Sequence, residues 1–178
     1  MRRLILSMMV SVDGYIEGEN KELDWHVWDD ELEQHMTQFF TTVDTMIFGR
    51  VAYELMISYW PNATDSIAPQ MNTLPKLILS NTLQTPIWNS QILNGDIAGK
   101  INRLKLQSGK DIVVFGGARA AHTLMNLGLI DEYQLIVNPV VLGSGKPLFK
   151  FGSEKLNLKL VNSVAFKCGN IKLYYQPA

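Results

Sequence analysis

The sequence predicts an α/β domain with a mostly parallel central sheet and an antiparallel hairpin at the C-terminus. Short apolar segments rich in β-branched residues alternate with segments whose apolar residues recur at helical spacing. The first apolar run, 4–12, is almost continuous, as in a strand covered on both faces. The last two apolar segments, 158–166 and 171–175, flank Gly169-Asn170 with no helix between them, which indicates a hairpin.

The first half of the chain predicts two helices around a short strand. Acids at 29–31 suit the first turn of a helix, and an apolar face follows them. That face consists of Leu32, Met36, Phe39, Phe40 and Val43. A strand at 45–48 and a helix at 51–60 come next, and Pro61 ends the helix. Residues 62–73 are polar, and we expect them to be irregular.

The second half continues the alternation. Residues 76–79 form a predicted strand, and a weaker one falls within 87–93. Asp96 is placed to cap a helix that Gly109 ends. Further strands are predicted at 112–115 and 133–137, with a helix ending at Gly128 between them and a glycine- and proline-rich loop over 138–149 afterwards.

Length and composition limit the class of protein. The chain has 178 residues, which fits one domain over 1–178, with 47% hydrophobic and 19% charged residues. A formal net charge of -1 gives no electrostatic reason to expect nucleic acid or an acidic membrane as partner. No apolar run approaches the ~20 residues of a membrane span. The single cysteine, Cys168, suits a reducing cytoplasm.

The segment 112–119 suggests a binding site. A buried strand stops at Gly116-Gly117, and a helix begins directly afterwards. The free N–H groups and partial positive charge of a helix N-terminus favour an anion. Because glycine has no Cβ, a ligand can approach this backbone closely. We interpret the turn as the phosphate-binding turn of a nucleotide cofactor.

Two other predicted strands also end in small or polar residues, namely Gly49-Arg50 and Ser80. In an open α/β sheet, ligands bind outside the carboxyl ends of the strands, so these turns are expected to share one groove. Arg50 offers a planar fork for a 2′-phosphate, which favours NADPH over NADH. Taken singly, each feature also fits an ordinary turn, surface ion pair or cap, and the sequence holds no G-x-G-x-x-G fingerprint.

Several segments, in this order, resemble a known superfamily. They are Ser11-Val12-Asp13-Gly14-Tyr15-Ile16, Phe48-Gly49-Arg50-Val51-Ala52-Tyr53-Glu54, Tyr59-Trp60-Pro61, Phe115-Gly116-Gly117-Ala118, Gly128-Leu129-Ile130-Asp131-Glu132, Pro139-Val140-Val141-Leu142-Gly143-Ser144-Gly145 and Leu148-Phe149. Together they resemble the dihydrofolate-reductase-like superfamily, in the branch related to the reductase domain of the riboflavin-biosynthesis deaminase-reductase. The resemblance covers nearly the whole chain and implies a dihydrofolate-reductase-like three-layer fold.

The resemblance also implies an NADPH site and its residues. Gly49-Arg50 matches the segment that reaches the 2′-phosphate, and Ala52 stands where threonine is usual, so one hydroxyl contact is lost. Ser80 matches a residue near the adenosine. The pyrophosphate turn matches Gly116, Gly117, Ala118 and Arg119, while Val10, Ser11 and the loop after them would flank the nicotinamide. The branch is commonly dimeric, which implies a homodimer here.

The implied activity is hydride transfer from NADPH to a small-molecule substrate. In the riboflavin pathway the acceptor is 5-amino-6-(5-phosphoribosylamino)uracil, and in dihydrofolate reductases it is a pterin C=N bond. A non-catalytic, dimeric NADPH-binding module is the third hypothesis. Each reduction needs a donor held against the acceptor and a proton for the heteroatom.

Candidates for the proton donor and the substrate contacts lie in the first loop and first helix. Asp13 and Asp29 are the two candidate acids, although a turn cap and a helix N-cap are the alternative roles. Trp25 is a candidate stacking residue, with Leu142 and Gly143 as further substrate contacts. The histidines have no metal-ligand spacing with Cys168, so we expect no metal site.

Overall fold

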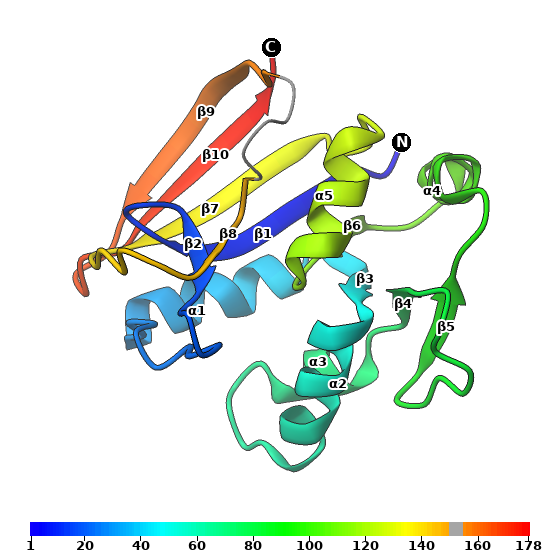
Figure 1. The fold of residues 1–178 in the computed structure, drawn as a ribbon, viewed down its shortest axis with the longest axis horizontal. Helices are drawn as coiled ribbons and strands as arrows, with labels where there is room; N and C mark the ends of the chain where they lie inside the picture. The colour runs from blue at the N-terminus through cyan, green and yellow to red at the C-terminus, as the bar shows by residue number, and fades with distance from the viewer. Residues whose placement is uncertain (150–154) are drawn as a thin grey trace.

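The structure is a computed structural model and describes residues 1–149 and 155–178. Its main sheet has strands in the order β5-β4-β3-β6-β1-β7-β10-β9 (Figure 1). The bounds of these strands are β1 Leu4–Ser11, β3 Val43–Gly49, β4 Lys76–Leu79, β5 Ser90–Leu93, β6 Asp111–Val114, β7 Glu132–Asn138, β9 Leu158–Ala165 and β10 Ile171–Pro177. The helices are α1 Asp30–Phe40, α2 Arg50–Tyr59, α3 Ala68–Thr73, α4 Ile97–Leu106 and α5 Ala118–Asn126.

The pairing of the strands confirms the predicted architecture. β1 is central and runs parallel to both β6 and β7. β3 runs parallel to β6 and β4, and β4 runs parallel to β5. Only β10 reverses direction, because it pairs antiparallel with both β7 and β9. The sheet is therefore mostly parallel with an antiparallel C-terminal hairpin.

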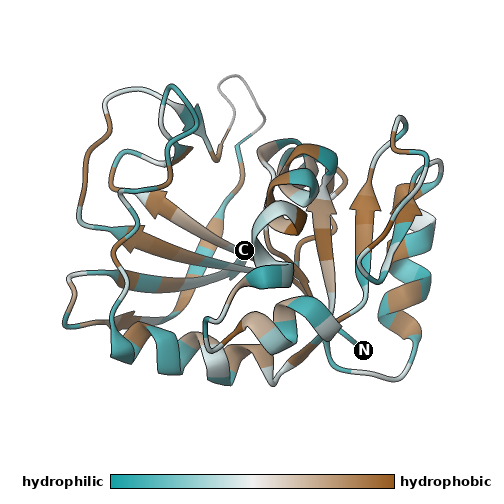
Figure 2. Cartoon of the chain, turned by 90° about the horizontal axis from the view of Figure 1, so that it is seen from below, coloured by the Kyte–Doolittle hydropathy of each residue, from teal (hydrophilic) through white to brown (hydrophobic). Residues whose placement is uncertain are grey.

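Helices cover both faces of the sheet and make three layers. Successive residues of β1 point to opposite faces, so Leu4 and Leu6 belong to one core cluster and Ile5 to the other. The helices α4 and α5 pack on the first cluster, whereas α1, α2 and α3 pack on the second. Figure 2 shows the consequence, with largely hydrophobic strands between helices of mixed character.

The predicted elements agree with the structure except in three places. Val43 was placed on the apolar face of the first helix, which is wrong, because α1 ends at Phe40 and Val43 begins β3. Residues 62–73 were expected to be irregular, which is wrong, because α3 occupies 68–73. Its proline lies in the first turn, where no N–H is needed, and Met71 is fully buried. The loop 138–149 contains a short strand, β8 (Lys146–Pro147), which pairs with β2 (Tyr15–Glu17). A Cβ at Gly145 would lie 2.2 Å from the carbonyl oxygen of Glu17, so only glycine permits this approach.

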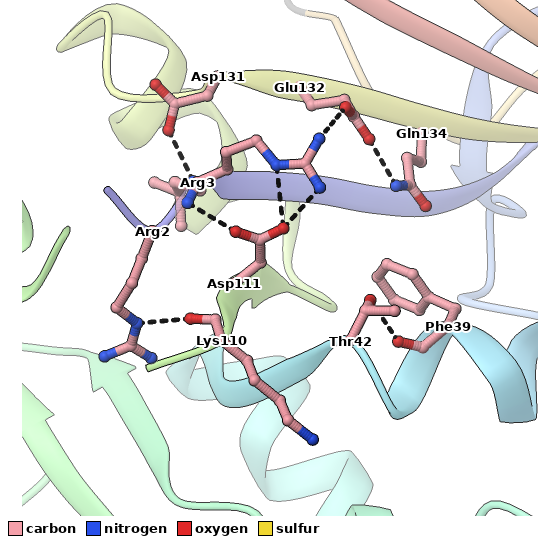
Figure 3. A network of polar contacts seen from close by, with 10 residues as sticks. Arg2, Arg3, Phe39, Thr42, Lys110, Asp111, Asp131, Glu132 and Gln134 are labelled. Atoms are coloured by element: carbon pink, nitrogen blue, oxygen red, sulfur yellow. Dashed lines mark hydrogen bonds and ion pairs between the residues drawn. The ribbon is translucent and has the colours of Figure 1, made fainter. Parts of the chain in front are cut away.

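The amino ends of the strands are joined by charged side chains, on the opposite side from the predicted site. The guanidinium of Arg3 lies between Asp111 at 2.6 Å and Glu132 at 2.8 Å (Figure 3). Glu132 in turn accepts a hydrogen bond from the amide of Gln134 at 2.7 Å. These contacts join β1, β6 and β7 at one edge and leave the carboxyl ends of the strands to the loops. Within the described residues, no helix has the length and apolarity needed to cross a membrane.

Candidate active site

The glycine turns after β3 and β6 touch each other. The N–H of Gly49 donates to the carbonyl oxygen of Gly116 at 3.3 Å. Gly117 has a φ of +93°, and a Cβ there would lie 3.2 Å from the nitrogen of Gly49. Both the backbone conformation and the close approach therefore require glycine. The structure brings together two turns that are more than sixty residues apart in the sequence.

The same contact places two helix N-termini side by side, and both lack a side-chain cap. Gly49 is the N-cap of α2 and Gly117 is the N-cap of α5. By contrast, Asp29 caps α1 and Asp96 caps α4 through side-chain oxygens. The first backbone N–H groups of an uncapped helix have no partner within the helix. The paired ends of α2 and α5 therefore form a site that suits an anion.

The charges of the first turns support the same conclusion. Neither α2 nor α5 has an acid there, although acids are the residues that a helix dipole favours at this end. Both helices carry an arginine instead, Arg50 in α2 and the exposed Arg119 in α5. Arg50 contacts Glu54 at 2.7 Å, and both side chains are partly exposed to solvent, so an incoming phosphate can displace this pair.

Ala52 and Ser80 border the turns in different ways. A Cβ at Gly116 would lie 3.2 Å from the methyl group of Ala52, so this methyl group packs directly beneath the turn. The hydroxyl oxygen of Ser80 accepts hydrogen bonds from the N–H groups of Thr82 at 3.1 Å and Leu83 at 2.9 Å. Ser80 therefore caps a turn at the end of β4, and its hydroxyl hydrogen remains a possible donor. Ala118 is buried beneath the α5 turn.

Val10 and Ser11 are buried at the carboxyl end of β1, beside the glycine turns in the sheet order. The hydroxyl of Ser11 donates to Asp13 at 2.6 Å. The other contacts of Asp13 are the N–H groups of Leu142 at 3.1 Å and Gly143 at 2.8 Å. The hydroxyl of Ser11, aided by these N–H groups, lowers the pKa of Asp13. This geometry supports a turn-capping role, because an acid with a lowered pKa is a poor proton donor near neutral pH.

Asp29 has a similar role at the start of α1. One carboxylate oxygen accepts the N–H of Leu32 at 2.8 Å, and the other accepts the N–H of Cys168 at 3.1 Å. Glu31 binds the neighbouring N–H of Lys167 at 3.0 Å. The first turn of α1 is thus attached to the turn between β9 and β10. Proton transfer by Asp29 or Asp13 stays a prediction, and capping is what their contacts explain.

Trp25 and Leu142 line one open pocket of about 390 Å³, and their contact with a substrate stays a prediction. Its walls come from the loop after β2 and from the glycine-rich loop after β7. The residues that line it are Gly18, Glu19, Asn20, Glu22, Asp24, Trp25, Leu142 and Ser144. Gly143 lies next to this wall and binds Asp13 through its backbone.

Two asparagines of this region were missed by the sequence analysis. Asn138 at the end of β7 and Asn170 in the last hairpin are both fully buried, and both bind the backbone of Val27. Asn138 is a polar residue at the end of an apolar strand, and this position in the sequence could have indicated its structural role. In the part of the chain that the structure describes, no three His, Cys, Asp or Glu side chains are grouped to hold a metal ion.

The class of the protein follows from these features. A mostly parallel eight-stranded sheet, helices on both faces, a C-terminal hairpin and paired strand-end turns define an α/β fold of the dihydrofolate-reductase-like type. The chain belongs to the RibD C-terminal domain family, whose model matches residues 2–172. The family is reductase-like, and its reductases typically bind a nicotinamide cofactor.

Relatives and solved structures agree with this assignment. The chain is 39% identical over 180 residues to the uncharacterized protein YyaP of Bacillus subtilis, covering 98% of this chain and 94% of YyaP. It is 30% identical over 166 residues to YwjB of the same organism, covering 93% and 92% of the two chains.

Two solved structures share the fold. A Shewanella sp. PV-4 protein, provisionally named for riboflavin biosynthesis, matches with a TM-score of 0.82 at 21% identity over 99% of both chains. The diaminohydroxyphosphoribosylaminopyrimidine deaminase/5-amino-6-(5-phosphoribosylamino)uracil reductase of Thermotoga maritima matches with a TM-score of 0.73 at 13% identity. That match covers 99% of this chain and 57% of the other.

Proposed function

We propose that this chain is an NADPH-dependent reductase that resembles 5-amino-6-(5-phosphoribosylamino)uracil reductase of riboflavin biosynthesis. The observation that carries the proposal is the pair of uncapped helix N-termini. Each of the two helices has an arginine in its first turn, and neither has an acid there. A nucleotide pyrophosphate supplies the negative charge that this arrangement leaves unbalanced. The family supports a nicotinamide cofactor, and Arg50 supports the form with a 2′-phosphate.

The cofactor would lie along the carboxyl ends of β4, β3, β6 and β1. Ser80 would face the adenosine, Arg50 the 2′-phosphate, and the backbone at Gly117 the pyrophosphate. Val10 and Ser11 would border the nicotinamide, which supplies the hydride when the cofactor is bound. The fit is supported by Gly117, because a Cβ there would press against the backbone of Gly49 at 3.2 Å and force the two turns apart.

The substrate would enter between the first loop and the glycine-rich loop, where Trp25 and Leu142 share a pocket. Trp25 offers an aromatic face to a flat heterocycle. The pocket walls carry Glu19, Glu22 and Asp24, which can accept hydrogen bonds from amino groups and repel a phosphate. These acids suit an amino-bearing ring in this pocket, which both the aminouracil of the riboflavin intermediate and a pterin offer, so reduction of dihydrofolate is the second candidate.

The cofactor proposal is tested by titrating the protein with NADPH and NADH and following tryptophan fluorescence. We expect Arg50→Ala to weaken NADPH by about tenfold to hundredfold, because a charge-assisted hydrogen bond is lost. NADH should be affected little. Arg103→Ala is the matched control, since Arg103 is also an exposed helical arginine beside an acid, Asp96, on α4. Equal losses for both nucleotides would disprove the 2′-phosphate role, and no binding of wild type at millimolar NADPH would disprove the proposal.

Turnover separates the remaining alternatives. The wild-type protein is assayed for NADPH oxidation with 5-amino-6-(5-phosphoribosylamino)uracil, its dephosphorylated form and dihydrofolate. Faster oxidation with the phosphorylated pyrimidine supports the riboflavin-type activity, whereas a preference for dihydrofolate supports the second candidate. NADPH binding without turnover of any of them supports a non-catalytic module. We further propose a cytoplasmic location, in keeping with the free thiol of Cys168.

A further inference from the structure

Two asparagines hold the backbone of one residue, Val27, in the segment that carries Trp25 and Trp28. The side-chain oxygen of Asn138 accepts the N–H of Val27 at 2.9 Å. The side-chain nitrogen of Asn170 donates to the carbonyl oxygen of Val27 at 2.7 Å. Both asparagines are 0% exposed. Val27 is therefore fixed from both sides by residues more than a hundred positions away in the sequence.

Asn138 also ties this segment to the end of β1. Its side-chain nitrogen donates to the carbonyl oxygens of Val10 at 3.4 Å and Ile136 at 3.2 Å. One amide thus spans the gap between Val10 and Val27. Only a side chain with an acceptor at one end and donors at the other satisfies both backbones, so aspartate and leucine would each leave a buried polar group without a partner.

The segment around Val27 forms a wall of the candidate active site. Trp25 lines the pocket on one side of Val27, and Trp28 is exposed on the other. Just beyond Trp28, Asp29 binds the N–H of Cys168, two residues before Asn170. The backbone from 25 to 29 is therefore held at both Val27 and Asp29, which sets where the two indole rings lie.

We propose that Asn138 and Asn170 are positioning residues that fix the tryptophan-bearing wall at a set distance from Val10. For its catalytic consequence this inference rests on the proposed reductase function. Neither amide touches the reacting atoms. They act through Val27, and a shift of this wall by about 1 Å is enough to lower the rate of a reaction that needs donor and acceptor aligned.

The kinetic test uses Asn138→Ala and Asn170→Ala. We expect kcat/KM for whichever substrate the wild type reduces to fall by about tenfold to hundredfold. The Kd of NADPH should stay within about twofold, because the phosphate contacts lie at β3 and β6. Asn72→Ala is the matched control, since Asn72 also joins two segments, binding Trp60 and Trp88 far along the sheet. If all three variants lose stability alike and none loses kcat/KM, the proposal is wrong.

A second measurement does not need activity. Incorporation of 5-fluorotryptophan gives one ¹⁹F NMR signal for each of the 4 tryptophans. In Asn138→Ala the signals of Trp25 and Trp28 should shift or broaden, while those of Trp60 and Trp88 should not. Unchanged signals for Trp25 and Trp28 would overturn the proposal, whereas absent NADPH binding would overturn only the function. Asn170→Ala, which removes the donor to the carbonyl oxygen of Val27, replaces Asn138→Ala in this measurement if that variant fails to fold.

Discussion

Lys172 lies inside the layer between the sheet and α1, and its replacement by methionine should stabilise the protein. The side chain is fully buried, and among the described residues its Nζ has no hydrogen-bond partner. It lies over the rings of Phe39 at 4.7 Å and Tyr174 at 5.1 Å. Loss of hydration lowers its pKa from 10.5 to about 8, although the charge of Glu132 opposes the shift. Methionine has a similar length and no charge to bury.

The size of the effect follows from the pKa. A fall from 10.5 to about 8 means that the ammonium destabilises the folded state by about 3 kcal/mol at pH 7, at ~1.36 kcal/mol per unit. The folded protein releases this proton more readily than the unfolded chain. Wild-type stability should therefore rise between pH 8 and pH 10.5, and the cost should fall below about 1 kcal/mol at pH 10. Lys172→Met should be more stable than wild type by about 3 kcal/mol at pH 7, with most of the gap lost at pH 10.

Urea unfolding of both proteins at pH 7 and pH 10 measures this gap. Lys76 also has a pKa lowered to about 8, but it is present in both proteins and cancels in the difference. Lys105→Met is the control, because Lys105 is buried with partners, the carbonyl oxygen of Leu129 at 2.7 Å and Asp131 at 2.6 Å. That variant should lose about 1–3 kcal/mol. The reasoning would be refuted if Lys172→Met were no more stable than wild type at pH 7. It would also be refuted if the difference in free energy of unfolding between the two proteins were the same at pH 7 and pH 10.

Three further outcomes follow from the site and the sheet edge. Gly117→Ala should lower stability by about 1–3 kcal/mol, by urea unfolding, and abolish NADPH binding, because it forces a φ of +93° on alanine. Asp13→Asn should lower the Tm and leave kcat within about threefold if the carboxylate only caps its turn; a loss of more than about hundredfold at normal Tm would instead support proton transfer. We propose a homodimer through β9, the end strand, where Val161 is 53% exposed. Light scattering should give twice 20.1 kDa for wild type and a monomer for Val161→Lys, and a monomeric wild type would contradict the dimer.

The glycine turns of the candidate site were predictable because their signals are local. A strand followed by Gly116-Gly117 and then by a helical pattern predicts a tight strand-to-helix turn. The structure has this turn between β6 and α5. The same holds for Gly49-Arg50 at the end of β3. What the sequence could not indicate is that Gly117 lies against Gly49, because that contact depends on β6 pairing between β3 and β1.

The missed elements have different causes. α3 is only six residues long and is stabilised by burying Met71 and Ala68, so it has too few turns for a helical period to emerge. β8 is a two-residue strand that depends on its partner β2, 129 or more positions earlier in the chain. In both cases tertiary contacts, rather than local preference, decide the conformation.

The substrate side of the candidate site was less predictable because its carboxyl groups accept hydrogen bonds from backbone N–H groups. From the sequence, Asp13 in a loop and Asp29 in a first helical turn fit a proton donor as well as a turn cap or a helix N-cap. In the structure each accepts N–H groups of distant segments, at Gly143 and at Cys168. A carboxylate that joins two segments in this way would have to take up a proton before it could donate one, which would weaken those hydrogen bonds. The proton for a reduction is therefore better sought from solvent or from the substrate's own ionisable groups, held in place by a wall that Asn138 and Asn170 fix.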